Sequence, residues 1–178
     1  MEQFRGTTII AVKKDGRTAI AGDGQVTLGQ NVVMKNNAVK VRRIYNDNVV
    51  VGFAGGAADA FSLSNRFEDM LNKFNGNLMR SAVELALAFR NDEIVRKLEA
   101  LMIVADKDNL IIISGNGEVT EPDDGICAIG SGGEYARAAA QALMGNTNLN
   151  AREIAVKSID IAANICIFTN HNIVVEEV

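Results

Sequence analysis

The sequence lacks several residues on which common classes of protein depend. Its 178 residues contain no tryptophan, one proline, two cysteines and one histidine. Two cysteines do not make a disulfide framework, so we expect a reducing compartment, the cytoplasm. With so few cysteine and histidine residues, we expect no zinc site built from nitrogen and sulfur ligands. A serine–histidine–aspartate hydrolase would have to use His171, which lies near the C-terminus and which we expect at the surface.

Long apolar runs and a strong excess of one charge are also missing. No run approaches the ~20 residues of a membrane span. The first six residues, MEQFRG, have no apolar stretch of the kind found in signal peptides. A net charge of −4 does not suggest nucleic-acid binding. The composition, 48% hydrophobic and 22% charged, is ordinary for one globular domain with a core.

The hydrophobic pattern divides the chain into groups of strands and pairs of helices. Apolar segments bounded by turn residues predict strands at 7–14, 17–21, 31–35, 39–45, 49–54, 101–105, 110–114, 125–129 and 171–178. Helical spacing predicts helices at 57–74, 79–98, 134–143 and 151–165, with Phe61, Val83 and Leu87 on apolar faces. This order predicts one domain of two sheets flanked by two helical layers. The strict alternation of a doubly wound parallel sheet is absent.

A glycine-rich turn, Gly130 to Gly133, precedes the third predicted helix. Backbone N–H groups ahead of a helix can bind an anion. The same residues also suit a tight strand-to-helix turn with Ser131 near the helix start. Both interpretations stay open, and the first makes an anion- or nucleotide-binding α/β protein an alternative function.

The chain opens MEQFRGTTII, and the threonine pair suggests a hydrolase that needs no histidine. An N-terminal threonine uses its hydroxyl as nucleophile and its own α-amine as base. That amine has an ordinary pKa of about 7.7–8.0, which suits neutral pH. Thr7 would gain it only after removal of residues 1–6, and Gly6 leaves the preceding peptide bond free to bend for attack by Thr7. The same ten residues also suit a strand that simply begins with Thr7 and Thr8.

Five segments of the sequence resemble the HslV (ClpQ) family of bacterial, proteasome-like peptidases. They read TTIIAVKKDGRTAIAGDGQVTLGQ, KVRRIYNDNVVVGFAGGAADAF, RKLEALMIVAD, AIGSGGEYA and ICIFTNH. The resemblance runs from Thr7 to the C-terminus with essentially no gaps. It implies the α+β fold of N-terminal nucleophile hydrolases, a four-layer αββα sandwich. It also implies that residues 1–6 are a leader removed on maturation and that 7–178 form a single peptidase domain.

The resemblance assigns roles to individual residues. Thr7 matches the nucleophile, and alignment and the preceding glycine favour it over the next threonine. Lys40 matches the lysine beside the threonine hydroxyl, whose ammonium eases loss of the hydroxyl proton, and Asp23 the acid that keeps this lysine charged. Ser131 matches a serine that hydrogen-bonds near the threonine amine, and Gly55 the glycine whose N–H faces the oxyanion. Without the family, Lys40 fits a solvated strand lysine and Asp23 a turn aspartate.

The resemblance also implies two sets of main-chain contacts. Thr27 and Ala57 match positions whose main chain pairs with an extended peptide, as an added strand would. Ala163, Cys166 and Thr169 match carbonyls at the end of the last helix that can bind a sodium ion. Family members often have glycine where this chain has Ala163, a change that leaves the carbonyl in place. The side chain of Cys166 also suits a small buried apolar position.

The resemblance implies the peptidase subunit of a two-component, ATP-dependent protease. Two stacked hexameric rings would cleave unfolded proteins through an acyl-enzyme on Thr7. The AAA+ unfoldase HslU (ClpY) would deliver these proteins and activate the peptidase allosterically. The sequence has no P-loop, so only the partner would use ATP, and we expect no organic cofactor. Many members have only the initiator methionine before the threonine. In this chain six residues would have to be removed, by autolysis or by another protease. The remaining alternative is a catalytically silent ring subunit that keeps its leader.

Overall fold

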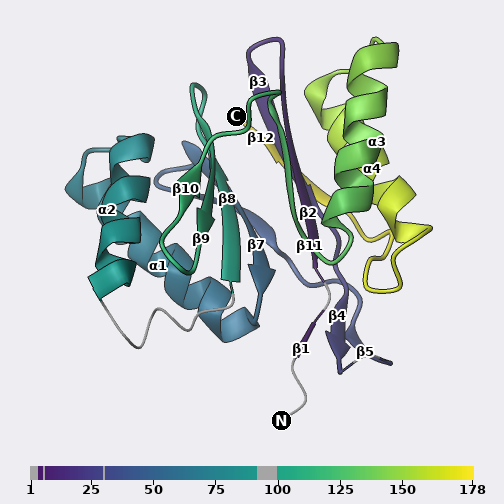
Figure 1. Ribbon diagram of the computed structural model, residues 1–178, viewed down its shortest axis with the longest axis horizontal. Coiled ribbons are helices and arrows are strands. Elements are labelled where there is room, and N and C mark those ends of the chain that lie inside the picture. The colour runs from purple at the N-terminus through teal and green to yellow at the C-terminus, as the bar shows by residue number, and fades with distance from the viewer. Residues whose placement is uncertain (1–3, 6, 30, 92–99) are drawn as a thin grey trace.

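The computed structural model describes residues 4–5, 7–29, 31–91 and 100–178, and these residues form four layers (Figure 1). Helices α1 and α2 form one outer layer, and helices α3 and α4 form the other. A five-stranded and a four-stranded sheet lie between them. The predicted α+β, four-layer αββα sandwich is therefore confirmed. No helix in the described part of the chain is long and apolar enough to cross a membrane.

The four-stranded sheet is antiparallel, in the order β11-β2-β3-β12. Its strands are β2 (Thr8–Lys14), β3 (Arg17–Gly22), β11 (Ile126–Gly130) and β12 (Val174–Glu177). Asp15 and Gly16 join β2 to β3 with φ values of 52° and 76°, the left-handed pair that such a two-residue hairpin requires. Helices α3 (Gly133–Asn146) and α4 (Ala151–Ala163) cover the outer face, and α4 begins with a capping box between Asn150 and Glu153.

The five-stranded sheet is also antiparallel, in the order β10-β9-β8-β7-β6. Its strands are β6 (Val41–Ile44), β7 (Val49–Gly55), β8 (Ala100–Ala105), β9 (Leu110–Ser114) and β10 (Val119–Thr120). Helices α1 (Ala57–Lys73) and α2 (Leu78–Asn91) cover its outer face. The predicted helix at 79–98 is confirmed to Asn91, and its remaining residues, 92–98, lie outside the described residues.

Three exposed residues of α1 and α2 correct the sequence analysis, although Leu63, Phe67 and Leu71 of α1 are buried as helical spacing predicts. Phe61, Val83 and Leu87 are 60%, 41% and 47% exposed, although helical spacing placed them on apolar faces. Four other apolar residues of α2 are buried in the core cluster against the sheet: Leu78, Ala82, Leu85 and Phe89. One of these is an alanine, whose small side chain lets the helix approach the sheet closely. Helical spacing alone does not decide which of two neighbouring rows of apolar side chains faces the sheet. Close packing against the sheet decides it.

Apolar residues between the two sheets hold the strand ends in fixed positions. Ile9 and Ile20 of one sheet pack with Val50 and Ile103 of the other, all fully buried. A methyl group at Gly52 would lie 2.7 Å from the Ile9 side chain, so the sheets touch there without room for more. This close packing makes the inter-sheet layer a rigid support for the chain segments that leave it.

A third, small sheet extends from one end of the sandwich (Figure 1). Its order is β1-β4-β5, with β1 (Phe4–Arg5), β4 (Val26–Leu28) and β5 (Val32–Lys35). The sequence analysis predicted β5 but not β1, β4 or β10, because these strands have only two or three residues. Such lengths are too short for a period-2 pattern to show.

Candidate active site

Five segments that are distant in the sequence meet at the end of the sandwich beside the small sheet. Thr7 precedes β2, Asp23 follows β3, Lys40 precedes β6, Gly55 ends β7 and Gly130 ends β11. Because neighbouring strands are antiparallel, strands that start at this end alternate with strands that finish there. The topology thus brings together residues that the sequence separates by more than a hundred positions.

The carboxylate of Asp23 is the centre of this region. It is 1% exposed and accepts four hydrogen bonds. Oδ1 accepts from Lys40 Nζ at 3.0 Å and from the Thr8 amide at 2.8 Å. Oδ2 accepts from the Gln25 amide at 2.9 Å and from the Asn170 amide at 3.3 Å. Donors from four segments therefore fix one carboxylate, and that carboxylate fixes the ammonium group.

Lys40 is buried, with 9% of its surface exposed, so the interpretation as a solvated strand lysine was wrong. It lies just before β6, and its ammonium donates to the Gln25 carbonyl at 2.5 Å as well as to Asp23. Burial lowers the pKa of Lys40 below the ordinary lysine value, and the ion pair with Asp23 offsets only part of this effect. The structure therefore presents a positioned ammonium that gives up its proton more readily than an exposed lysine would.

The two threonines have different surroundings. Thr7 is 8% exposed, and its carbonyl accepts a hydrogen bond from the Ser131 amide at 2.8 Å. Thr8 is fully buried. Its hydroxyl lies 2.6 Å from the Thr169 hydroxyl and accepts from the Gly132 amide at 3.0 Å. The Thr8 hydroxyl thus has partners in two other segments, which suits a structural role for this residue.

The glycine-rich turn after β11 packs directly on the start of β2. Gly130 has a φ of 90°, and a methyl group there would lie 2.0 Å from the Thr7 carbonyl oxygen. Only glycine fits this position. The amides of Ser131 and Gly132 already donate to Thr7 and Thr8, so two groups that an anion would need are occupied. This geometry favours the tight-turn interpretation over the anion-binding one.

The end of β7 lies beside this turn. A methyl group at Gly130 would be 3.4 Å from the Ala54 side chain, and Gly55 follows with a φ of 131°. Gly55 is exposed, so its backbone can be approached closely. The Phe53 amide donates to the Lys40 carbonyl at 3.1 Å, which ties β7 to the lysine. Ala57, the second position expected to meet a substrate main chain, is the first residue of α1.

Thr27, the other expected substrate-binding position, lies in the middle of β4. One edge of β4 pairs with β5, where Thr27 faces Val33. The other edge pairs with β1, where Thr27 faces Arg5 and Leu28 faces Phe4. Residues of the expected leader therefore occupy an edge of the strand on which an extended substrate is expected.

The candidate sodium ligands lie where α4 ends. The helix finishes at Ala163, and the chain then folds back so that the amides of Ile165 and Cys166 both donate to the Ala162 carbonyl. The Thr169 amide donates to the Cys166 carbonyl at 3.1 Å. Backbone carbonyls at the negative end of a helix are oxygen donors of the type that hard cations prefer, so the residue types fit such an ion, and the sodium site stays a prediction.

Two side chains near this loop, those of Cys166 and His171, agree with the simpler expectations. Cys166 is 7% exposed, as expected for a small buried residue. His171 is at the surface, with Nδ1 2.7 Å from an Asp160 carboxylate oxygen. Among the described residues, no group of three or more His, Cys, Asp or Glu side chains could hold a metal.

Sequence reasoning missed the residues that bind the site together. Gln25 donates through Nε2 to Thr27 Oγ1 at 3.1 Å and to the Ile167 carbonyl at 2.8 Å. Asn170 contacts Asp23 through its amide and Gly24 through its side chain. Both residues lie within the motifs GDGQ and TNH, but no local pattern distinguishes an amide that joins remote segments from one in a polar turn.

Known proteins are similar to this chain in sequence and in fold. The Proteasome subunit family model matches residues 3–178. The ATP-dependent protease subunit HslV of Enterococcus faecalis is 59% identical over 177 residues, which cover 98% of this chain and 97% of that protein. This chain belongs to the HslV family. The crystal structure of eukaryotic HslV from Trypanosoma brucei superposes with a TM-score of 0.90 at 46% identity, covering 96% of this chain and 98% of that one.

More distant structures share the HslV fold alone. Thiobacillus denitrificans BPH in complex with epoxomicin has a TM-score of 0.72 at 21% identity and covers 96% of this chain and 97% of its own. The end of the sandwich described above is therefore built on an architecture that persists when four-fifths of the sequence differs. The HslV relatives, with much higher identity, match this chain in sequence as well.

Proposed function

We propose that this HslV-family chain is the threonine-type peptidase subunit of an ATP-dependent protease, with Thr7 as nucleophile once residues 1–6 are removed. The observation that carries the proposal is the buried Lys40–Asp23 pair, 3.0 Å apart, at the end of the sandwich where β2 starts. A charged pair in a nearly dry site shifts the proton equilibria of its neighbours. Identity to HslV of E. faecalis across almost the whole chain supports the same conclusion.

The chemistry follows from these groups. The free α-amine of Thr7 takes the hydroxyl proton as Oγ attacks the peptide carbonyl carbon, and the nearby Lys40 ammonium lowers the energy of the deprotonated oxygen. The Gly55 N–H stabilises the oxyanion, and Ser131 helps to hold the amine. The C–N bond breaks as the amine returns its proton to the leaving nitrogen, which leaves an ester on Thr7. Water hydrolyses the ester and restores the threonine.

The leader has a second role in this proposal. In the intact chain, β1 pairs with β4 at Arg5 and Thr27, where substrate main chain is expected to pair. Removal of residues 1–6 would therefore expose the Thr7 amine and also vacate the strand edge. A leader-bearing Thr7→Ala chain should bind an extended fluorescent peptide more weakly than a Thr7→Ala chain that begins at residue 7. Equal binding would contradict this role of the leader.

The remaining parts of the proposal come from the family. Two stacked hexameric rings would enclose the sites in the cytoplasm, and the unfoldase HslU would deliver substrates and favour the aligned site. A partner can shift the site only by as much as it binds the aligned state better. A sodium ion held by the carbonyls of Ala163, Cys166 and Thr169 would supply positive charge that stabilises the loop after α4.

Mass spectrometry and peptide hydrolysis test the proposal together. The mature chain should begin at Thr7, and a start at Met1, Glu2 or Thr8 would contradict it. Cleavage of a fluorogenic peptide should rise with HslU plus ATP, but not with ATP alone. Thr7→Ala should abolish cleavage while rings still form, and the matched control Thr147→Ala, at an exposed threonine after α3, should cleave normally. A chain that keeps its leader and never cleaves would instead be a silent ring subunit.

A further inference from the structure

Asn170 lies in the last loop of the chain and joins this loop to two segments of the candidate site. Its backbone amide donates to Asp23 Oδ2 at 3.3 Å. Its side-chain oxygen accepts from the Gly24 amide at 3.1 Å, and its Nδ2 donates to the Asn36 carbonyl at 2.9 Å. The same side-chain oxygen accepts from the Asn172 amide at 3.1 Å, which fixes the orientation of the side chain.

The segments that Asn170 joins are the ones that carry Asp23 and Lys40. Gly24 follows Asp23, and the segment that starts at Asn36 leads to Lys40 four residues later. The two segments touch, since a methyl group at Gly24 would lie 2.5 Å from the Asn36 carbonyl oxygen. Between Gly24 and this segment the backbone contributes one hydrogen bond, from the Ala38 amide to the Gly24 carbonyl at 2.9 Å. The Asn170 side chain adds a bridge from Gly24 to Asn36.

We propose that Asn170 is a positioning residue that sets the distance between Asp23 and Lys40. This inference rests on the proposed function. The bridge needs an acceptor for one backbone N–H and a donor for one backbone carbonyl, on a short side chain. A carboxamide supplies both, whereas an ionised carboxylate only accepts. The neighbouring Thr169 contacts the Thr8 hydroxyl at 2.6 Å, so the same loop holds both the strand that follows Thr7 and the acid that holds Lys40.

Asn172 provides a matched control. Its Nδ2 donates to the same Asn36 carbonyl at 2.7 Å, and its side chain is exposed like much of this loop. Its side-chain bond reaches neither Asp23 nor Gly24. Asn172→Ala therefore removes one bond to Asn36 and leaves the bridge to Gly24 intact. Asn170→Ala removes both sides of the bridge, and Asn170→Asp keeps the acceptor while losing the donor.

Kinetics of the mature assembly with HslU and ATP test the inference. We expect Asn170→Ala to lower kcat by about 10- to 100-fold, the effect of a misplacement of roughly 1 Å, with KM within about twofold because β4 is untouched. Asn170→Asp should fall between Asn170→Ala and the unaltered chain, and Asn172→Ala should keep kcat within about twofold. Both alanine variants are compared at a temperature well below their melting temperatures, so that a general loss of stability cannot explain the difference in kcat.

Hydrogen–deuterium exchange separates this inference from the proposed function. Peptides spanning 23–40 should exchange faster in Asn170→Ala than in Asn172→Ala, whether or not the protein cleaves peptides. Equal exchange, or equal kcat in the two alanine variants of an active enzyme, overturns the role of Asn170. If Asn170→Ala does not fold, an unchanged kcat in Asn170→Asp overturns it instead. An unaltered chain that never cleaves contradicts only the proposed function.

Discussion

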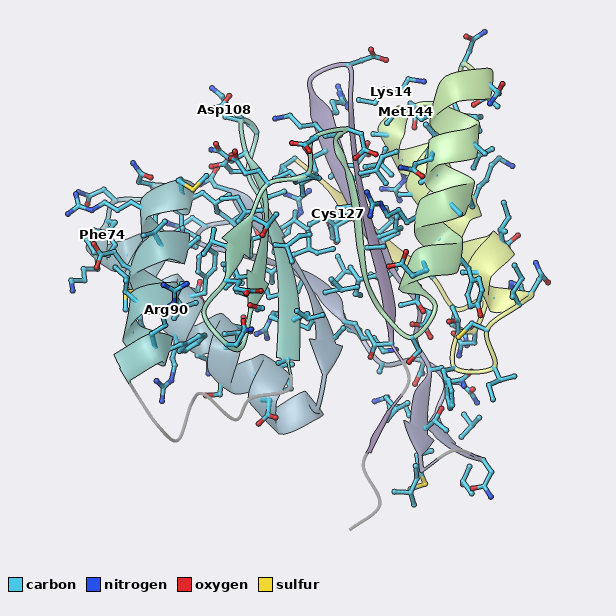
Figure 2. All side chains as sticks on the ribbon, in the orientation of Figure 1. Lys14, Phe74, Arg90, Asp108, Cys127 and Met144 are labelled. Atoms are coloured by element: carbon cyan, nitrogen blue, oxygen red, sulfur yellow. The ribbon has the colours of Figure 1, made fainter. Side chains whose placement is uncertain are left out.

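The two ends of the sandwich are built from opposite kinds of contact. At one end lie the hairpin turns, near Lys14 and Asp108 in Figure 2. There the Asp106 carboxylate accepts from the amides of Asp108 and Asn109, two and three residues away. At the other end, Asp23 accepts from an amide 147 residues away, and Thr8 meets a hydroxyl 161 residues away.

This difference shows at which end the polar groups depend on tertiary structure for their hydrogen bonds. At the turn end the Asp106 carboxylate is satisfied by neighbours in the chain, so this turn can form with little help. The contacts to remote segments there are made by the lysine side chains of Lys13 and Lys14, which donate to the carbonyls of Asp108 and Leu149. The polar groups of the site end are buried and satisfied only when remote segments have met. Loss of one partner there leaves a buried group unsatisfied, which costs more than loss of an exposed contact.

Replacement of one member of a buried and of a partly exposed ion pair should give the largest contrast. Lys40→Ala removes the partner of a buried carboxylate at the site end and should lower the free energy of unfolding by about 3–5 kcal/mol, besides removing most peptide cleavage. Arg43→Ala breaks a partly exposed pair with Glu176 at 2.8 Å, away from the site, and should cost less than about 1 kcal/mol. Urea denaturation at matched protein concentration measures both, and equal midpoints would remove the energetic distinction between the buried site and the exposed surface.

Two glycines with positive φ give the second contrast. At Gly16 a methyl group meets nothing within 4 Å, so Gly16→Ala should cost only the backbone strain, about 1–2 kcal/mol. At Gly130 the methyl group would lie 2.0 Å from the Thr7 carbonyl. Gly130→Ala should therefore lower stability more than Gly16→Ala does and also displace Thr7, with a loss of kcat that Gly16→Ala does not share. Thermal melting and peptide hydrolysis of both variants test this, and matched results would show that the turn has room to yield.

The pH dependence of cleavage compares the buried Lys40 with an ordinary exposed lysine. Because burial lowers the pKa of Lys40, its ammonium should lose a proton at a lower pH than an exposed lysine. Activity that needs the ammonium should therefore fall, as pH rises, before the ordinary lysine pKa of about 10.4 is reached. Lys40→Arg keeps its charge at high pH. In whatever activity this variant retains, the fall of kcat/KM at high pH should therefore move to a higher pH. A fall that stays in place would assign the titration to another group.

The smallest effect concerns the interior between the two ends. Cys127 lies in β11 with 3% of its surface exposed, and burial raises its pKa to about 12. Since the thiolate is the reactive form, iodoacetamide at pH 8 should leave Cys127 unmodified in the folded protein and alkylate it in denaturant. Mass spectrometry of the digested protein would detect the modification, and rapid labelling of the native chain would indicate that the inter-sheet layer opens.

Sequence reasoning succeeded where structure is local. The Asp15–Gly16 hairpin, the four helices and the longer strands follow from turn residues and periodicity. Residue patterns also gave the two-sheet, two-helix-layer order. They did not reveal that Lys40 is buried or that Phe61 and Val83 are exposed, because burial depends on which faces other elements cover.

The residues of the candidate site also divide into those that local patterns suggested and those that they did not. A threonine pair after a glycine suggested a nucleophile, whereas the assignments of Lys40, Asp23 and Gly55 came from resemblance to a family. Asn170 and Gln25 escaped both approaches. Their contribution is a set of hydrogen bonds to segments more than a hundred residues away, for Asn170 with Asp23 and for Gln25 with Ile167. No pattern within a window of sequence records such a bond.

The bond between Asn170 and Asp23 also sets a schedule during protein synthesis. A ribosome adds about 5–20 residues per second, so the last loop emerges on the order of ten seconds after Asp23. Until then the carboxylate lacks one of its donors, and Thr8 lacks the hydroxyl of Thr169. If residues 1–6 are removed by autolysis at the proposed site, chains stalled before residue 169 should therefore still carry them. Completion of the proposed site would then wait for the last segment of each chain.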